Sequence, residues 1–109
     1  TCIRDYIHVQ DLAEAHLAAL EYLEKTDESI IANCGYGQGT SVKEAVDITK
    51  EAVTNDFEVK IKPRRPGDLP FVVSRTARIT DIVGWSPRYN DLHEIIRHSV
   101  GWEKRRIQS

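Results

Sequence analysis

The sequence has few cysteines, no long apolar run and no excess of one charge. Its two cysteines, Cys2 and Cys34, are too few and too far apart to favour a disulfide scaffold or a zinc site. No apolar run approaches the roughly 18 residues of a membrane span, and no signal-peptide pattern is present. A net charge of −2 argues against duplex DNA as a partner. These absences favour a cytoplasmic protein with neither a membrane nor a nucleic-acid partner.

The 109 residues are enough for one domain, and an apolar share of 40% permits a packed core. The chain starts at Thr1 without an initiator methionine, and a strand-like pattern begins at once. We therefore expect it to be a piece of a longer polypeptide.

Hydrophobic periodicity predicts a small α+β fold with short strands and about four helices. Alternation over residues 2–9 predicts a strand with Arg4, Tyr6 and His8 on one face. Asp11, followed by Glu14, predicts the N-cap of a helix that runs to about residue 24. The stripe of apolar residues on that helix predicts that His16 faces the core.

Further strands are predicted at 30–33, 57–61 and 71–73, from short apolar or alternating runs. Ser41 with Glu44 predicts a second helix N-terminus, and Asp91 with Glu94 predicts the start of the last helix. The last helix is expected to carry its apolar residues inward, Trp102 included. Between these two helices, Ser74 or Thr76 is expected to begin a short helix that Gly84 ends.

The segment Gly35-Tyr36-Gly37-Gln38-Gly39 follows a predicted strand and precedes a predicted helix, as a dinucleotide-binding loop does. Its spacing is G-x-G-x-G, however, and Thr40 stands where the last glycine of the fingerprint belongs. We therefore interpret the segment as a tight connection and predict no cofactor-binding residue in it.

The run Arg64-Arg65-Pro66-Gly67-Asp68 carries the strongest chemical signal. Pro and Gly suit the two central positions of a type II turn, which brings Arg65 and Asp68 within roughly 7 Å. A guanidinium binds a diphosphate well, and a nearby carboxylate accepts hydrogen bonds from a sugar diol. A solvated turn with a local salt bridge is the competing interpretation. No arrangement of residues indicates a nucleophile, an acid–base pair or a metal site.

Four segments, in order, closely resemble the C-terminal part of UDP-glucose 4-epimerases, which are extended short-chain dehydrogenases/reductases. They are Thr1-Cys2-Ile3-Arg4-Asp5-Tyr6-Ile7-His8-Val9 with Asp11-Leu12-Ala13, the stretch from Asn33 to Val42 with its three glycines, Arg64 to Asp68, and Gly84-Trp85 with Pro87. The resemblance implies that residues 1–109 form the small UDP-sugar-binding domain of a Rossmann-type enzyme. The N-terminal NAD-binding Rossmann domain is then absent from this chain.

The resemblance also implies the roles of individual residues. Arg4 and Arg65 would bind the diphosphate of UDP-glucose or UDP-galactose, and Asp68 would hydrogen-bond the uridine ribose. Val72 stands at the site that the family associates with room for N-acetylated sugars. The absent domain would hold NAD and a Tyr-x-x-x-Lys pair, and no tyrosine here is followed four residues later by lysine.

By this resemblance, the full-length enzyme is expected to interconvert the two sugars through a 4-keto intermediate, as a homodimer. The chain alone would have no catalytic residue, no activity and little affinity for UDP-sugars. Another UDP-sugar epimerase or dehydratase of the same family is an alternative. A non-catalytic anion-binding module is a second alternative.

Overall fold

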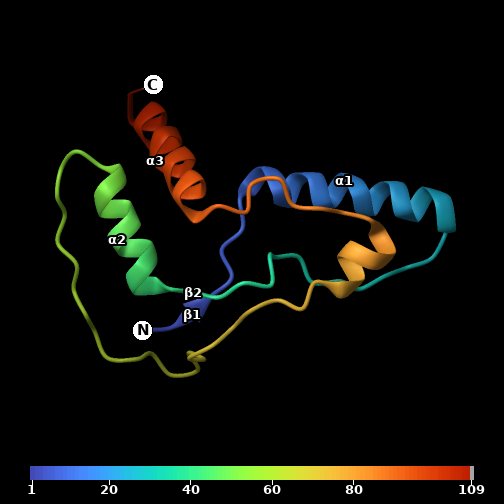
Figure 1. Cartoon of the computed structure of the whole chain (residues 1–109), viewed down its shortest axis with the longest axis horizontal. Helices are drawn as coiled ribbons and strands as arrows, with labels where there is room; N and C mark the ends of the chain where they lie inside the picture. The colour runs from blue at the N-terminus through green and yellow to red at the C-terminus, as the bar shows by residue number, and fades with distance from the viewer. Residues whose placement is uncertain (109) are drawn as a thin grey trace.

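The computed structural model describes residues 1–108. The elements follow in the order β1 (Ile3–Arg4), α1 (Val9–Thr26), β2 (Thr40–Ser41), α2 (Val42–Ala52), η1 (Ile79–Val83) and α3 (Leu92–Gln108). Figure 1 shows α1 and η1 at one end of the molecule and α2 and α3 at the other, with the two short strands between them. This arrangement confirms the predicted α+β class with about four helices.

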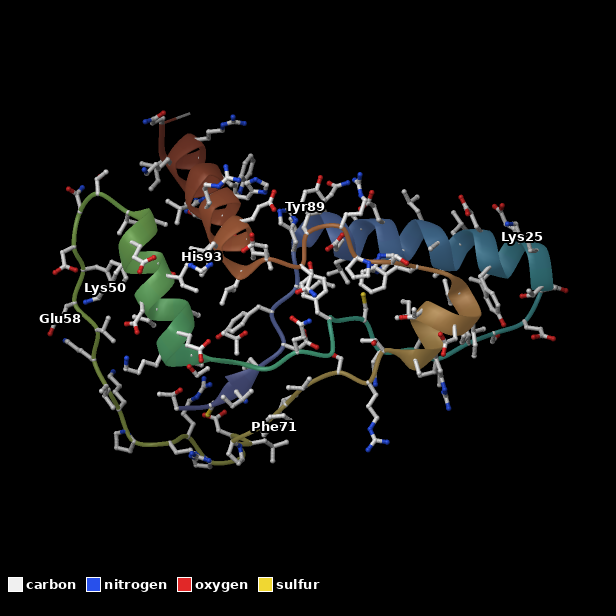
Figure 2. The ribbon with its side chains drawn as sticks, viewed as in Figure 1. Lys25, Lys50, Glu58, Phe71, Tyr89 and His93 are labelled. Carbon is white, nitrogen blue, oxygen red and sulfur yellow. The ribbon has the colours of Figure 1, made fainter. Side chains whose placement is uncertain are left out.

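The strand β1 lies between two other segments. On one side it pairs antiparallel with β2, with Ile3 opposite Ser41. On the other side, Ile3 N–H donates to Pro70 O at 2.9 Å, and Val72 N–H donates to Ile3 O at 3.0 Å. Figure 2 shows Phe71 close to β1 on this side. The ladder is thus much shorter than the strand predicted over 2–9, and the strand predicted at 71–73 is reduced to one bridge at Phe71.

The helix α1 begins earlier than the sequence predicted. His8 is its N-cap, and His8 Nδ1 accepts a hydrogen bond from Gln10 N–H at 2.9 Å. Asp11, the predicted cap, lies inside the first turn and is fully buried, because it binds backbone groups from distant segments. The inward orientation predicted for His16 is also wrong, since this side chain is exposed and contacts Leu12 O.

The helices α2 and α3 pack against each other, as Figure 1 shows. The predicted cap of α2 is confirmed, because Ser41 Oγ accepts from Glu44 N–H at 3.0 Å. The predicted start of α3 is confirmed as well, since Asp91 Oδ1 accepts from His93 N–H at 3.0 Å. Trp102 is 63% exposed on α3, so its predicted inward position is wrong.

Two predicted strands do not form. Residues 30–33 and 57–61 are extended or irregular, with Ile31 84% exposed and Ile61 98% exposed. An isolated extended segment gains no ladder hydrogen bonds, and within residues 1–108 no strand lies beside either one. Their apolar patterns therefore have no sheet to join in this chain.

The buried core lies between α1 and η1. Ala15, Ile79 and Trp85 form it, and side chains such as Ile7 and Tyr36 pack around them. Gly84 ends η1 with φ of 85°, a left-handed conformation that glycine adopts without strain, as the sequence predicted. None of the helices in the described part of the chain is both long and apolar enough to cross a membrane.

Candidate functional site

The predicted turn is present. Asp68 N–H donates to Arg65 O at 3.2 Å, and Gly67 has φ of 85°, which matches the third position of a type II turn. Across the turn, Arg65 Nε donates to Asp68 Oδ2 at 3.0 Å and Arg65 Nη2 donates to Oδ1 at 3.4 Å. The Arg65 side chain is 84% exposed, so its remaining N–H donors face solvent.

Electrostatics connect Arg4 with this turn. The pKa of Asp68 is lowered, first by the hydrogen bond from Arg65 and then by the positive charges of Arg65 and Arg4. Arg4 ends β1, and its Nη1 donates to Ile3 O at 2.8 Å. The charges of both predicted arginines therefore act on the same carboxylate, that of Asp68.

The backbone of Val72 is hydrogen-bonded to β1. Its N–H donates to Ile3 O, beside Arg4, and its side chain is 44% exposed. The four predicted site residues thus come from β1 and from the 65–72 segment that passes beside β1.

A second feature, which sequence reasoning missed, is the position of Asp5. Asp5 Oδ1 accepts from Tyr36 N–H at 3.0 Å, and Oδ2 accepts from Gly37 N–H at 2.9 Å and from Ser74 N–H at 3.2 Å. One carboxylate therefore connects three distant segments. The only signal in the sequence was an acidic residue interrupting the apolar face of the predicted strand.

Asp11 makes an analogous set of contacts. It accepts hydrogen bonds from the Tyr36 hydroxyl at 2.5 Å and from the N–H groups of Arg88 and Tyr89, each at 2.9 Å. Burial opposes the charged form, but these hydrogen bonds outweigh it and lower the pKa of Asp11. Burial and the bond to Asp11 both raise the pKa of Tyr36. Tyr36 thus connects Asp5, through its backbone, with Asp11, through its hydroxyl.

His8 does not share an open face with Arg4. It is buried, stacks on Tyr89 with ring centroids 4.5 Å apart, and has Nε2 at 2.8 Å from His98 Nδ1. Because His8 Nδ1 accepts from Gln10 N–H, Nε2 carries the proton and donates to His98. Figure 2 shows Tyr89 beside the start of α1, where this stack lies. His98 thus connects α3 with the N-cap of α1.

The glycine segment has a packing explanation. A Cβ on Gly35 would lie 2.7 Å from Asp5 Oδ2, and a Cβ on Gly39 would lie 2.5 Å from Ile3 Cγ2. These glycines allow the backbone to approach β1 and the Asp5 carboxylate closely. Among residues 1–108, no three His, Cys, Asp or Glu side chains are grouped as metal ligands.

The chain is similar to known proteins over its whole length. The chain is 44% identical over 109 residues to a UDP-glucose 4-epimerase of Azospirillum brasilense, covering all of this chain and 31% of that protein. No protein-family model matches.

Solved structures give the same result for the fold. A UDP-Glc/GlcNAc 4-epimerase from Campylobacter jejuni superposes with a TM-score of 0.85 at 47% identity, over 96% of this chain and 32% of that one. A UDP-glucose 4-epimerase from Stenotrophomonas maltophila was solved with NAD and formylated UDP-arabinopyranose. It superposes with a TM-score of 0.91 at 35% identity, over 99% of this chain and 32% of that one.

Sequence and fold both match the C-terminal part of nucleotide-sugar 4-epimerases. The curated relatives include UDP-glucose 4-epimerases and, at similar identity, probable UDP-arabinose 4-epimerases such as one from Arabidopsis thaliana, 44% identical over 104 residues. The match to the UDP-glucose 4-epimerases lies in their C-terminal part. The chain spans about a third of the length of the curated relatives that it matches.

Proposed function

We propose that this chain is the UDP-sugar-binding part of a UDP-glucose 4-epimerase that interconverts UDP-glucose and UDP-galactose. The main support is that Asp68 pairs with Arg65 in the turn and that its pKa is lowered by Arg65 and also by the charge of Arg4, which lies far away in sequence. Two cations beside a carboxylate suit a nucleoside diphosphate better than a neutral ligand. Homology to UDP-glucose 4-epimerases over the whole chain supports the same assignment.

Each residue has a role in this proposal. The guanidiniums of Arg4 and Arg65 bind the two phosphates, and the Asp68 carboxylate accepts hydrogen bonds from the ribose hydroxyls. Val72 lies where the hexose passes β1. In epimerisation at C4 the hexose must turn over while the nucleotide stays fixed, so strong charged contacts belong on the UDP and weaker ones on the sugar.

The cofactor belongs to the preceding domain in this proposal. NAD supplies hydride transfer at the sugar C4 when bound there. The residues of this chain bind and orient the substrate, and no residue among 1–108 is assigned a proton-transfer step. Neighbouring structures that were solved with NAD support NAD as the cofactor of the full-length enzyme.

The test is UDP binding by the complete gene product that contains this chain. Arg65→Ala removes charge-assisted hydrogen bonds worth about 1.5–3 kcal/mol, so we expect the dissociation constant for UDP to rise roughly tenfold or more. Arg105→Ala is the matched control, because it removes the same charge from the exposed end of α3. Calorimetric titration gives both constants. Unchanged UDP affinity in Arg65→Ala would remove the role proposed for the turn.

The identity of the sugar is tested separately. The Campylobacter jejuni relative is named for both UDP-Glc and UDP-GlcNAc, so epimerisation of an N-acetylated sugar is the main alternative activity. Product analysis with UDP-galactose, UDP-N-acetylgalactosamine and UDP-arabinose separates these possibilities. Equal turnover of all three would contradict a dedicated UDP-glucose enzyme.

Location and assembly belong to the same proposal. We assign the full-length protein to the cytoplasm, which agrees with two free cysteines in this chain, and to a homodimer, by analogy with the epimerase family. Size-exclusion chromatography with light scattering measures the assembly directly.

A further inference from the structure

The Asp5 carboxylate occupies a position where the β1 ladder stops. Ile3 pairs with the 70–72 segment through two backbone hydrogen bonds, and beyond that point the ladder does not continue. There, Ser74 N–H donates instead to Asp5 Oδ2. The Asp5 side chain therefore takes the place of the next backbone acceptor in the ladder. It keeps β1 and the 70–74 segment together.

The residues connected in this way adjoin the proposed UDP-binding side chains. Asp5 directly follows Arg4, and Ser74 lies two residues after Val72. A shift of one residue between two paired segments sends every side chain to the opposite face. By fixing Ser74 relative to β1, Asp5 fixes which face Arg4 and Val72 present.

The third segment holds the carboxylate in place. Tyr36 and Gly37 donate their N–H groups to its two oxygens, and Gly35 leaves no room for a Cβ beside it. The Cβ would also lie 2.7 Å from Ser74 Oγ. Backbone donors on fixed segments restrict the carboxylate to one orientation.

We propose that Asp5 is the positioning residue of the UDP-binding surface. It sets the register between the strand that carries Arg4 and the segment that carries Val72 and the Arg65–Asp68 turn. It does not touch the ligand and acts through these residues. The inference rests on the proposed function and adds a specific residue to it.

The test compares Asp5→Asn with Asp11→Asn in the complete gene product. An amide offers one acceptor oxygen and presents N–H donors where the second oxygen stood, so at least one backbone donor loses its partner in each variant. The two variants are matched in chemistry and in the number of protein donors that surround the carboxylate. They differ in location, because the Asp11 contacts join α1 to the Tyr36 hydroxyl and to residues 88–89, and none of them reaches the 70–74 segment.

We expect Asp5→Asn to raise the dissociation constant for UDP roughly tenfold, with the NAD content unchanged. Asp11→Asn is expected to lower the thermal unfolding midpoint at least as much, yet to change UDP affinity less than about twofold. A purely structural role of Asp5 predicts the opposite result, in which both variants lose affinity in proportion to stability. That result, or wild-type affinity in Asp5→Asn, would overturn the inference.

Two additions keep the test decisive. If Asp5→Asn gives no folded protein, Gly35→Ala displaces the carboxylate without removing it, and we expect the same loss of UDP affinity. Arg65→Ala is titrated in parallel. A loss of affinity in Arg65→Ala without a loss in Asp5→Asn or Gly35→Ala rejects only the positioning role, whereas no loss in Arg65→Ala rejects the proposed function itself.

Discussion

The centre of the molecule and its outer loop use carboxylates in opposite ways. At the centre, Asp5 and Asp11 accept hydrogen bonds from backbone groups of three other segments and connect β1 and α1 to the rest of the fold. In the loop at 54–68, Asp68 binds only its neighbour in the turn, Arg65. Asp11 is fully buried, whereas Arg65 is 84% exposed.

The loop has few connections to the helices. Figure 2 shows Lys50 reaching from α2 toward it, and Lys50 Nζ lies 3.6 Å from Asp56 Oδ1 and 5.5 Å from the Phe57 ring centroid. Its residues from 54 to 67 are all exposed. Substitutions at the centre should therefore change the free energy of unfolding more than substitutions on the exposed surface or in the loop do. Three predictions test this division.

The largest effect is expected for Asp11→Ala. The substitution leaves the Tyr36 hydroxyl and the N–H groups of Arg88 and Tyr89 without their acceptor, and we expect a loss of about 3 kcal/mol in the free energy of unfolding. Denaturant unfolding of the complete gene product measures it. Asp47→Ala is the control, because its exposed salt bridge with Lys43 contributes about 0.5 kcal/mol. Similar losses in the two variants would contradict the contrast.

Gly39→Ala should have the next largest effect. The added methyl would meet Ile3 Cγ2 at 2.5 Å and Val73 Cγ2 at 3.1 Å, so we expect a loss of about 2 kcal/mol from overpacking. Gly101→Ala is the matched control on α3, where no atom lies within 4 Å of the new Cβ. There the same change should stabilise the protein by about 0.5–1 kcal/mol, since alanine favours helix. Both values come from chemical denaturation, and a gain in Gly39→Ala would show that the approach to β1 is not tight.

The smallest effect is expected from acid, because protonation leaves the carboxyl group in place. Hydrogen bonds hold the folded-state pKa of Asp11 below its ordinary value of 3.8, so its contribution is complete above that pH. The contribution is lost as the pH falls through the folded-state pKa. Stability measured between roughly pH 2 and pH 6 should therefore decrease less steeply in Asp11→Asn than in the wild type.

Asp68→Asn provides the comparison from the loop. The pKa of Asp68 is lowered too, chiefly by Arg65, but the Arg65 side chain is 84% exposed, so salt screens the pair. Its removal should leave the acid dependence of stability almost unchanged. A larger change in Asp68→Asn than in Asp11→Asn would reverse the proposed division between centre and loop.

Local chemistry in the sequence predicted the features that depend on neighbouring residues. The turn at Arg65–Asp68, the Ser41 cap and the Gly84 end of η1 each need only a few adjacent residues, and all three are confirmed. Asp11 was wrongly predicted as a cap because its partners lie 25 to 78 positions away in sequence.

The prediction of strands at 30–33 and 57–61 was wrong for a related reason. The apolar pattern at 30–33 is typical of a strand, but a strand needs a neighbour that offers free backbone groups, and none of the residues 1–108 provides one there. A common site for Arg4 and the turn stays a prediction, and the resemblance to epimerases was its only source in the sequence. The Asp5 contacts could not be predicted from the sequence, because periodicity does not indicate which distant N–H groups donate hydrogen bonds to a carboxylate.

The way in which Val72 is held has a consequence for evolution. Its backbone is fixed by the bond to Ile3 O, while its side chain is only partly covered. Side-chain substitutions at position 72 therefore change the shape of the surface and leave the pairing with β1 in register. Under the proposed function, the preference for one sugar over another can therefore drift in a lineage at almost no cost to folding.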